Sequence, residues 1–153
     1  MTALQDNPVK LGERFERRVV FDADSIRRFA TISGDHNPLH HDDATAARSP
    51  FGRIIASGPH ITSLMLGLDA TYFTRWFDAL GLSFEFRFVK AIPAGTELTL
   101  EWTISGCTHK PSLDGFVVEV DGRAVDDAGT VYTTGHGANL IRVREPVART
   151  GST

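Results

Sequence analysis

Cysteine is nearly absent from the sequence, which holds one, Cys107, in 153 residues. A single cysteine cannot form an intrachain disulfide, so the composition favours a reducing compartment. No apolar stretch approaches the length needed to cross a bilayer. The first residues also lack the basic segment and apolar core of a signal peptide. These absences predict a cytoplasmic protein.

A strong excess of charge of either sign is also absent. The 16 basic and 19 acidic residues leave a formal net charge of −3, which gives no global attraction to nucleic acid or to an anionic membrane. We therefore expect neither partner. No Gly-x-Ser-x-Gly element occurs, which argues against a serine hydrolase. With 41% hydrophobic and 23% charged residues, the chain has the composition of one ordinary globular domain.

The chemically richest stretch is Gly34-Asp35-His36-Asn37-Pro38-Leu39-His40. Pro38 is expected to forbid a helix there because its ring clashes with the preceding turn, and it pushes Asn37 toward an extended conformation. A bent, non-helical segment can turn Asp35 and His40 toward one point, as general acid–base catalysis requires. The same residue types also form plain surface turns, so a solvated turn is the alternative interpretation.

Helices are predicted on both sides of this stretch. Asp22 is a suitable N-cap for a short amphipathic helix over residues 24–33, which Gly34 ends. Residues 41–57 are expected to form a short helical turn followed by an extended segment. Residues 59–73 are apolar over so much of their surface that a long buried helix is expected.

Alternation of apolar and polar residues predicts half-buried strands elsewhere. These strands are expected over residues 14–21, 84–88, 98–104, 116–125 and 130–141. The second and third are joined around Pro93, and the last two flank Asp126-Asp127-Ala128-Gly129, a hairpin signal. Gly135 and Gly137 predict a bulge or close packing on the helix.

The order of these elements predicts an α+β fold. We expect a single domain over residues 13–142, in which an antiparallel sheet wraps around a long central helix. A flexible lead-in (1–12) and a flexible tail (143–153) are expected to flank it.

The central motif resembles that of a known family. The resemblance rests on Ser33-Gly34-Asp35-x-Asn37-Pro38-Leu39-His40, then Phe51 and Ile54-Ile55-Ala56-x-Gly58. This pattern is similar to the MaoC-like, (R)-specific enoyl-CoA hydratases of the hot-dog fold, and the similarity covers residues 10–142. It implies hydration of trans-2-enoyl-CoA to 3-hydroxyacyl-CoA, or the reverse, by a homodimer or higher homo-oligomer. It implies no cofactor, because coenzyme A is part of the substrate.

The resemblance also implies roles for the motif residues. Asp35 and His40 are expected to hold one water and to carry both proton transfers, and Asn37 is expected to order the site.

The start of the long helix is expected to bind the substrate. Gly58 can present a backbone N–H to the thioester oxygen, with Ser57 and His60 beside it. Family members often have His-Gly-Met where this chain has Ser57-Gly58-Pro59. Pro59 has no N–H, so the donor set relies on Gly58 and on later residues, and the substrate preference stays open.

Three alternatives remain beside this hypothesis. A non-catalytic acyl-thioester-binding subunit of a hetero-oligomeric dehydratase would keep the fold, and a thioesterase can share it. The Asp35 and His40 pair favours a hydratase, because a scaffold does not need it. A metal site at His36, His40, His41 and Asp42 is disfavoured, because Pro38 excludes a helical pair of histidines and the spacing matches no common zinc pattern.

Overall fold

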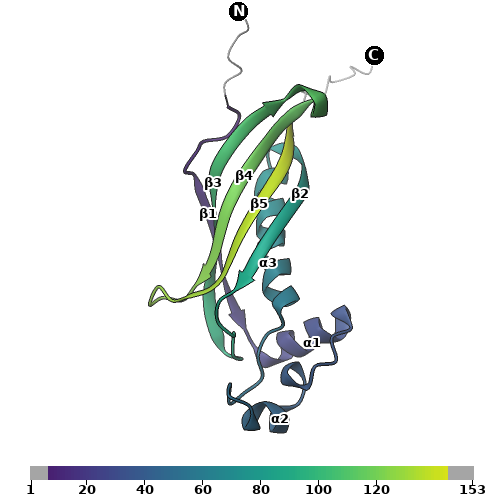
Figure 1. Cartoon of the computed structure of the whole chain (residues 1–153), viewed down its shortest axis with the longest axis vertical. Helices are drawn as coiled ribbons and strands as arrows, with labels where there is room; N and C mark the ends of the chain where they lie inside the picture. Colours follow the sequence, from purple (N-terminus) through teal and green to yellow (C-terminus); the bar gives the residue numbers. More distant parts are fainter. Residues whose placement is uncertain (1–6, 145–153) are drawn as a thin grey trace, which may run out of the picture.

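Five strands form one antiparallel sheet in the computed structural model, which describes residues 7–144. The order across the sheet is β1-β3-β4-β5-β2, and the strands curve along the length of the molecule (Figure 1). Their bounds are β1 (Arg14–Phe21), β2 (Phe77–Phe88), β3 (Thr96–Lys110), β4 (Gly115–Val125) and β5 (Val131–Val143). All five predicted strands are confirmed, although β2 begins seven residues before the predicted segment because Phe77 to Leu82 lack a clear alternation.

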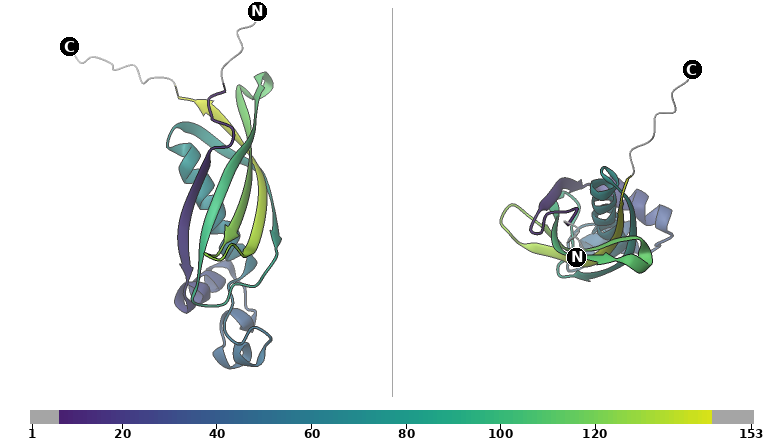
Figure 2. Two further views of the ribbon diagram at one scale, coloured as in Figure 1. Left: turned by 90° about the vertical axis from the view of Figure 1, so that its left-hand side faces the viewer. Right: turned by 90° about the horizontal axis from the view of Figure 1, so that it is seen from above.

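The long helix α3 (Gly58–Thr74) lies in the curve of the sheet, as the view from above shows (Figure 2). Ile61 and Met65 are buried, and the indole N–H of Trp102 on β3 donates to the Met65 carbonyl at 2.9 Å. The helix predicted over residues 59–73 is therefore confirmed. Its far side is exposed at Ser63 and Gly67, so α3 is buried along one side and not all round.

Local capping explains the shorter helix α1 (Ala23–Ser33). The Asp22 carboxylate accepts from the Ser25 N–H at 2.9 Å, and Gly34 closes the helix at φ 72°, a left-handed conformation that glycine adopts without strain. Both predicted caps are confirmed.

The segment after α1 contains one turn of helix that was not expected, because residues 38–40 form the 3₁₀ helix η1 (Pro38–His40). The short helical turn predicted within residues 41–57 is confirmed by α2 (Asp43–Arg48). The prediction of a wholly non-helical bend was wrong, because Pro38 occupies the first position of the turn, where its missing N–H has no intrahelical partner to lose.

Strands β2 and β3 are joined around Pro93 as predicted, and they are not neighbours in the sheet, since β2 pairs with β5 and β3 pairs with β1 and β4. One expectation about the sheet needs correction. Gly135 and Gly137 form no bulge in β5, and a Cβ at either position would collide with the rings of Phe86 or Phe84. The close packing is therefore against aromatic side chains of β2 and, at Gly135, also against Trp102 of β3, but not against the helix.

The predicted lead-in (1–12) and tail (143–153) are only partly described. Residues 1–6 and 145–153 lie outside the described residues. Within the described part, the Gly12 N–H donates to the Ile104 carbonyl at 2.8 Å, which ties the start of the chain to β3. No helix in residues 7–144 combines the length and the apolar character needed to span a membrane.

Candidate active site

The structure brings Asp35 and His40 together. His40 is buried, and its Nδ1 lies 2.7 Å from the Ile55 carbonyl oxygen, which can only accept a hydrogen bond. The proton of a neutral imidazole must therefore sit on Nδ1. This leaves Nε2 as an acceptor, 3.4 Å from Oδ2 of Asp35. Two acceptors side by side, one of them on a partly exposed carboxylate, form a site that a water molecule can bridge by donating to both.

Several short hydrogen bonds hold Asp35 in this position. Its N–H donates to the Ala30 carbonyl at 2.9 Å, which extends the end of α1. Its Oδ1 accepts from the Asn37 N–H at 3.0 Å, and its carbonyl oxygen accepts from Nε2 of His41 at 2.6 Å. Backbone and one carboxylate oxygen are thus fixed, and Oδ2 is left to face His40.

Asn37 lies beside the pair and orders the loop. Its side-chain oxygen accepts from the Leu39 N–H at 3.1 Å and caps η1. Because the same residue donates its own N–H to Asp35, it links the carboxylate to the turn that carries His40.

The other candidate metal ligands are committed elsewhere. The side chain of His41 bonds to a backbone carbonyl, and Asp42 caps α2 by accepting from the Thr45 N–H, a bond that lowers the pKa of the Asp42 carboxyl. His36 is exposed. No group of three or more His, Cys, Asp or Glu side chains within residues 7–144 is arranged to hold a metal ion.

An extended segment connects the pair to the start of α3. Ile55, whose carbonyl accepts from His40, also donates its N–H to the Leu39 carbonyl at 3.1 Å. Ala56 then pairs with Ile92 through a 2.8 Å bond. Gly58 is three residues beyond Ile55, so their Cα atoms are at most about 10 Å apart.

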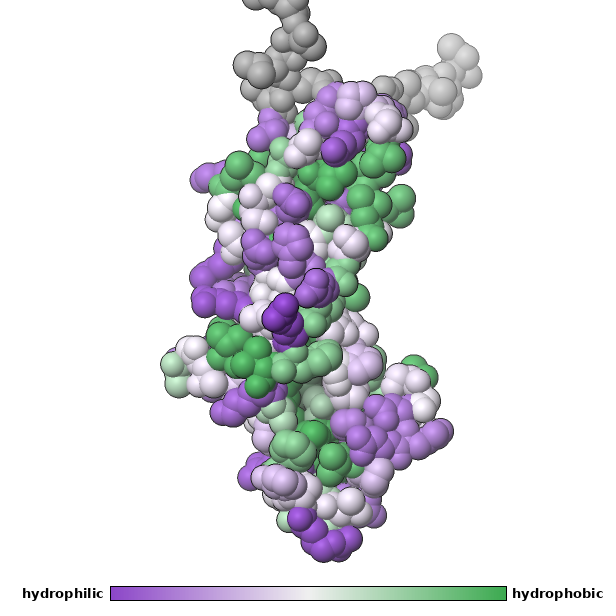
Figure 3. All heavy atoms as spheres, in the orientation of Figure 1, coloured by the Kyte–Doolittle hydropathy of each residue, from purple (hydrophilic) through white to green (hydrophobic). Residues whose placement is uncertain are grey.

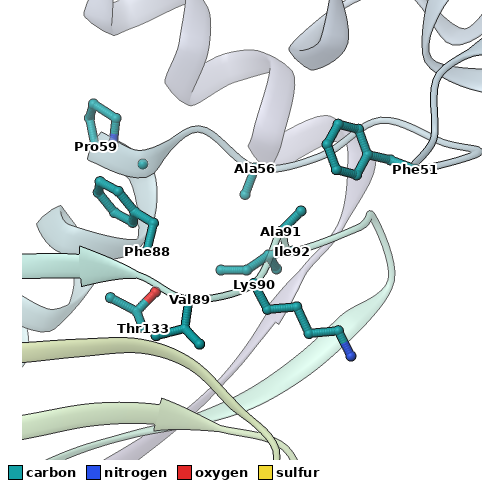
Figure 4. Close-up of a pocket in the computed structure, with 10 residues that line it drawn as sticks. Phe51, Ala56, Pro59, Phe88, Val89, Lys90, Ala91, Ile92 and Thr133 are labelled. Carbon is teal, nitrogen blue, oxygen red and sulfur yellow. The ribbon is translucent and has the colours of Figure 1, made fainter.

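A cavity of about 490 Å³ lies at the start of α3. Its walls are mostly apolar, and Figure 4 shows Ala56, Phe88 and Ile92 around it, with Phe51 at one side. Gly58 and Thr133 also line it, but Asp35 and His40 do not. Of the predicted site residues, Gly58 lines this cavity, whereas Ser57, His60 and the acid–base pair do not.

Gly58 and Ser57, the two predicted residues at the start of α3, have different surroundings. Phe88 packs its ring on Gly58, since a Cβ added there would lie 2.7 Å from Cζ of Phe88. Ser57 is the N-cap of α3 but makes no capping bond. Its hydroxyl is buried and has no hydrogen-bond partner within residues 7–144.

His60 points toward α1 and not into the cavity. Its ring stacks on Phe29, with centroids 4.7 Å apart, and meets the edge of Phe21. Burial lowers the pKa of His60, although the nearby Asp22 carboxylate acts in the opposite direction. Burial of His60 between α1 and α3 therefore favours the neutral imidazole.

Phe88 and Thr133 are among the cavity residues to which sequence patterns assigned no role. Phe88 is the last residue of an alternating run and was expected to be half-buried, yet it is 60% exposed. Thr133 carries no motif. Residues 133, 135 and 137 lie on the same face of β5. Thr133 precedes two glycines on that face, and this alternation is the one sequence feature that could have drawn attention to it.

Comparison with known proteins shows which family the chain belongs to. The profile of the MaoC like domain matches residues 6–123. The chain belongs to this family. The resemblance inferred from the central motif is thereby confirmed.

Named relatives of this MaoC-like protein act on CoA thioesters. It is 38% identical over 60 residues to the (R)-specific enoyl-CoA hydratase of Aeromonas caviae, covering 39% of this chain and 45% of the relative. It is 34% identical over 67 residues to the 3-hydroxybutyryl-CoA dehydratase of Methylorubrum extorquens, covering 44% and 41%. The matched segments thus span less than half of either relative.

The structural similarity covers more of the chain. The (R)-hydratase from A. caviae superimposes with a TM-score of 0.78 at 25% identity, over 88% of this MaoC-like chain and 98% of the other. The predicted hot-dog fold, a sheet wrapped around a central helix, is confirmed.

Proposed function

We propose that this protein catalyses the reversible, (R)-specific hydration of trans-2-enoyl-CoA thioesters to 3-hydroxyacyl-CoA. The observation that carries the proposal is the approach of Asp35 Oδ2 to His40 Nε2, with the proton of a neutral imidazole fixed on Nδ1. Membership of the MaoC-like family supports the class of reaction. The hydratase and dehydratase names of its relatives support CoA thioesters as substrates.

The pair has the atoms that this reaction needs. Nε2 and Oδ2 both start without a proton, and one of them accepts a proton from water while the water oxygen bonds to C3. The same proton, directly or after transfer between Nε2 and Oδ2, is then delivered to C2, which restores the starting state. Asp35 and His40 together therefore balance the addition of water without a metal or an organic cofactor.

The start of α3 is placed to stabilise the charge that develops on the thioester oxygen. Gly58 is the first residue of the helix, so no helical carbonyl can accept its N–H. The positive end of a 17-residue helix adds a favourable dipole at the same point.

The first experiment is hydration of crotonyl-CoA, followed as the loss of enoyl-thioester absorbance. Asp35→Ala and His40→Ala are each expected to lower kcat by about 10²–10⁴-fold, the usual contribution of a positioned acid or base. His36→Ala is the matched control, because His36 lies in the same loop but is exposed. The product should be the (R)-3-hydroxy thioester.

Other outcomes would support the alternatives. Thioester binding without hydration by the wild type would indicate a non-catalytic subunit, and release of free CoA thiol would indicate a thioesterase. Wild-type rates in both alanine variants would contradict the assignment of Asp35 and His40.

A further inference from the structure

Two buried hydroxyl groups near the start of α3 lack hydrogen-bond partners within residues 7–144. They belong to Ser57, which is 3% exposed, and Thr133, which is 1% exposed. A buried hydroxyl without a partner destabilises a fold, so each one calls for an explanation. Thr133 lines the cavity at the helix start.

Phe88 separates Thr133 from the helix. The two residues face each other across β2 and β5 in the same register. In the two preceding pairs, Phe84 and Phe86 lie against Gly137 and Gly135. The Phe88 ring instead reaches away from the sheet and rests on Gly58. Figure 4 shows it between the start of α3 and Thr133, whose hydroxyl oxygen is on the side that faces Phe88.

The position of Phe88 suits a movable side chain. It is the last residue of β2 and is 60% exposed. An exposed ring can change its rotamer quickly and with little loss of packing. If it turns outward, it no longer stands between Gly58 and Thr133, which both line the cavity.

These two groups together match one kind of ligand atom. A backbone N–H and a hydroxyl O–H are both hydrogen-bond donors, and two donors suit a carbonyl oxygen that gains negative charge. Pro59 cannot supply a donor, because it has no N–H. A hydroxyl from β5 can take the place of the missing N–H.

We propose that the Thr133 hydroxyl is a second hydrogen-bond donor, beside the Gly58 N–H, to the carbonyl oxygen of the acyl thioester, and that the Phe88 ring gates access to it. This inference rests on the proposed function, because it assigns a further residue to the same site. It explains why Thr133 carries a buried hydroxyl that the folded chain leaves unpaired within residues 7–144.

The test compares Thr133→Val with Thr133→Ser. Valine keeps the shape and removes the donor, and serine keeps the donor. We expect Thr133→Val to lower kcat/KM for crotonyl-CoA by about 100-fold, as the loss of one oxyanion donor does elsewhere. Serine should retain most of the activity. Thr134→Val is the control, since the next residue of a strand faces the opposite side of the sheet.

Thermal unfolding distinguishes this role from a structural one. Removal of an unpaired buried hydroxyl should leave the melting temperature of Thr133→Val unchanged or raised. Lost activity with retained stability therefore supports the proposal. If valine at this position disturbs the fold, Thr133→Ala provides the same loss of the donor. A stable variant with wild-type kcat/KM would overturn it.

Binding of butyryl-CoA, which is saturated and cannot be hydrated, separates this proposal from the proposed function. If the wild type shows no hydratase activity, the function fails, but an approximately tenfold weaker affinity in Thr133→Val would still support the carbonyl contact. Unchanged affinity in that case would overturn it. For the gate, Phe88→Ala should raise the association rate of butyryl-CoA, and an unchanged rate would contradict a gating role.

Discussion

Asp69 is a buried acid that the proposed chemistry does not use. It lies on α3, is 2% exposed, and its Oδ1 accepts from the Asn139 side-chain amide on β5 at 3.0 Å. Burial raises the pKa of Asp69 to about 6 from an ordinary value of 3.8, although the Asn139 hydrogen bond acts in the opposite direction. The folded protein therefore binds a proton here more tightly than the unfolded chain.

This shift fixes the sign of a pH effect on stability. The stabilising contribution of protonated Asp69 is fully present below pH 3.8 and is lost as the pH rises through about 6. Asp69→Asn should therefore be more stable than the wild type at pH 7.5, by up to roughly 3 kcal/mol at 1.36 kcal/mol per pKa unit. The difference between the two proteins should shrink at pH 4.5.

Urea unfolding at the two pH values measures this difference. Asp127→Asn is the control, because Asp127 is exposed and its surface ion pair with Arg18 contributes little. A free-energy difference between Asp69→Asn and the wild type that is the same at both pH values would contradict the shifted pKa.

The contacts around the acid–base pair show what a sequence can predict at this scale. Asp35, Asn37 and His40 lie within six residues, so their residue types and the bend between them are enough to predict that they converge. Thr133 and Phe88 are 45 residues apart, and only the strand pairing of β2 with β5 brings them together. A single threonine in a strand carries no local signal for that.

At the scale of helices and strands, the sequence predicted an element correctly where short-range interactions determine it. Asp22 and Gly34 cap α1 through bonds within a few residues, and the alternation in β3 buries Leu98, Leu100 and Trp102. Strand order was not predictable in the same way. Periodicity decides which face of a strand is buried, but it does not decide which strand lies beside it.

The glycines of β5 belong to this element-scale packing. A Cβ at Gly137 would collide with the ring of Phe84, which is held between β5 and Trp102. We expect Gly137→Ala to destabilise the protein by about 1–3 kcal/mol, the range for overpacking in a core. The free energy of urea unfolding is the measurement.

Gly67 offers the same substitution in open space. It lies in α3, is exposed, and an added Cβ would meet nothing within 4 Å. Gly67→Ala should therefore stabilise the protein by up to about 1 kcal/mol, the difference in helix propensity. Equal effects of the two substitutions would refute the assigned packing at Gly137.

At the scale of the whole molecule, the sheet has two edges, β1 and β2. In the described part of the chain, β2 pairs on one side only, with β5. Exposed apolar side chains lie on or near it, including Trp76, Leu80 and Leu82. Figure 3 shows apolar surface on the side where β2 runs in Figure 1. An open strand edge with apolar neighbours favours pairing with another chain.

We therefore propose that two copies of the protein associate through β2. A single substitution on this strand tests the proposal. Leu80 is 61% exposed, and burying a leucine stabilises an interface by about 1.5–3 kcal/mol. Leu80→Lys should thus raise the dimer dissociation constant by at least about tenfold, measured by sedimentation equilibrium.

Val20→Lys is the matched control, because Val20 lies on the opposite edge, β1, and is 52% exposed. A monomeric wild type, or a dimer weakened only by Val20→Lys, would exclude β2 as the interface. If the β2 dimer forms, loss of hydratase activity in Leu80→Lys with Asp35 and His40 intact would further show that the site depends on the second copy.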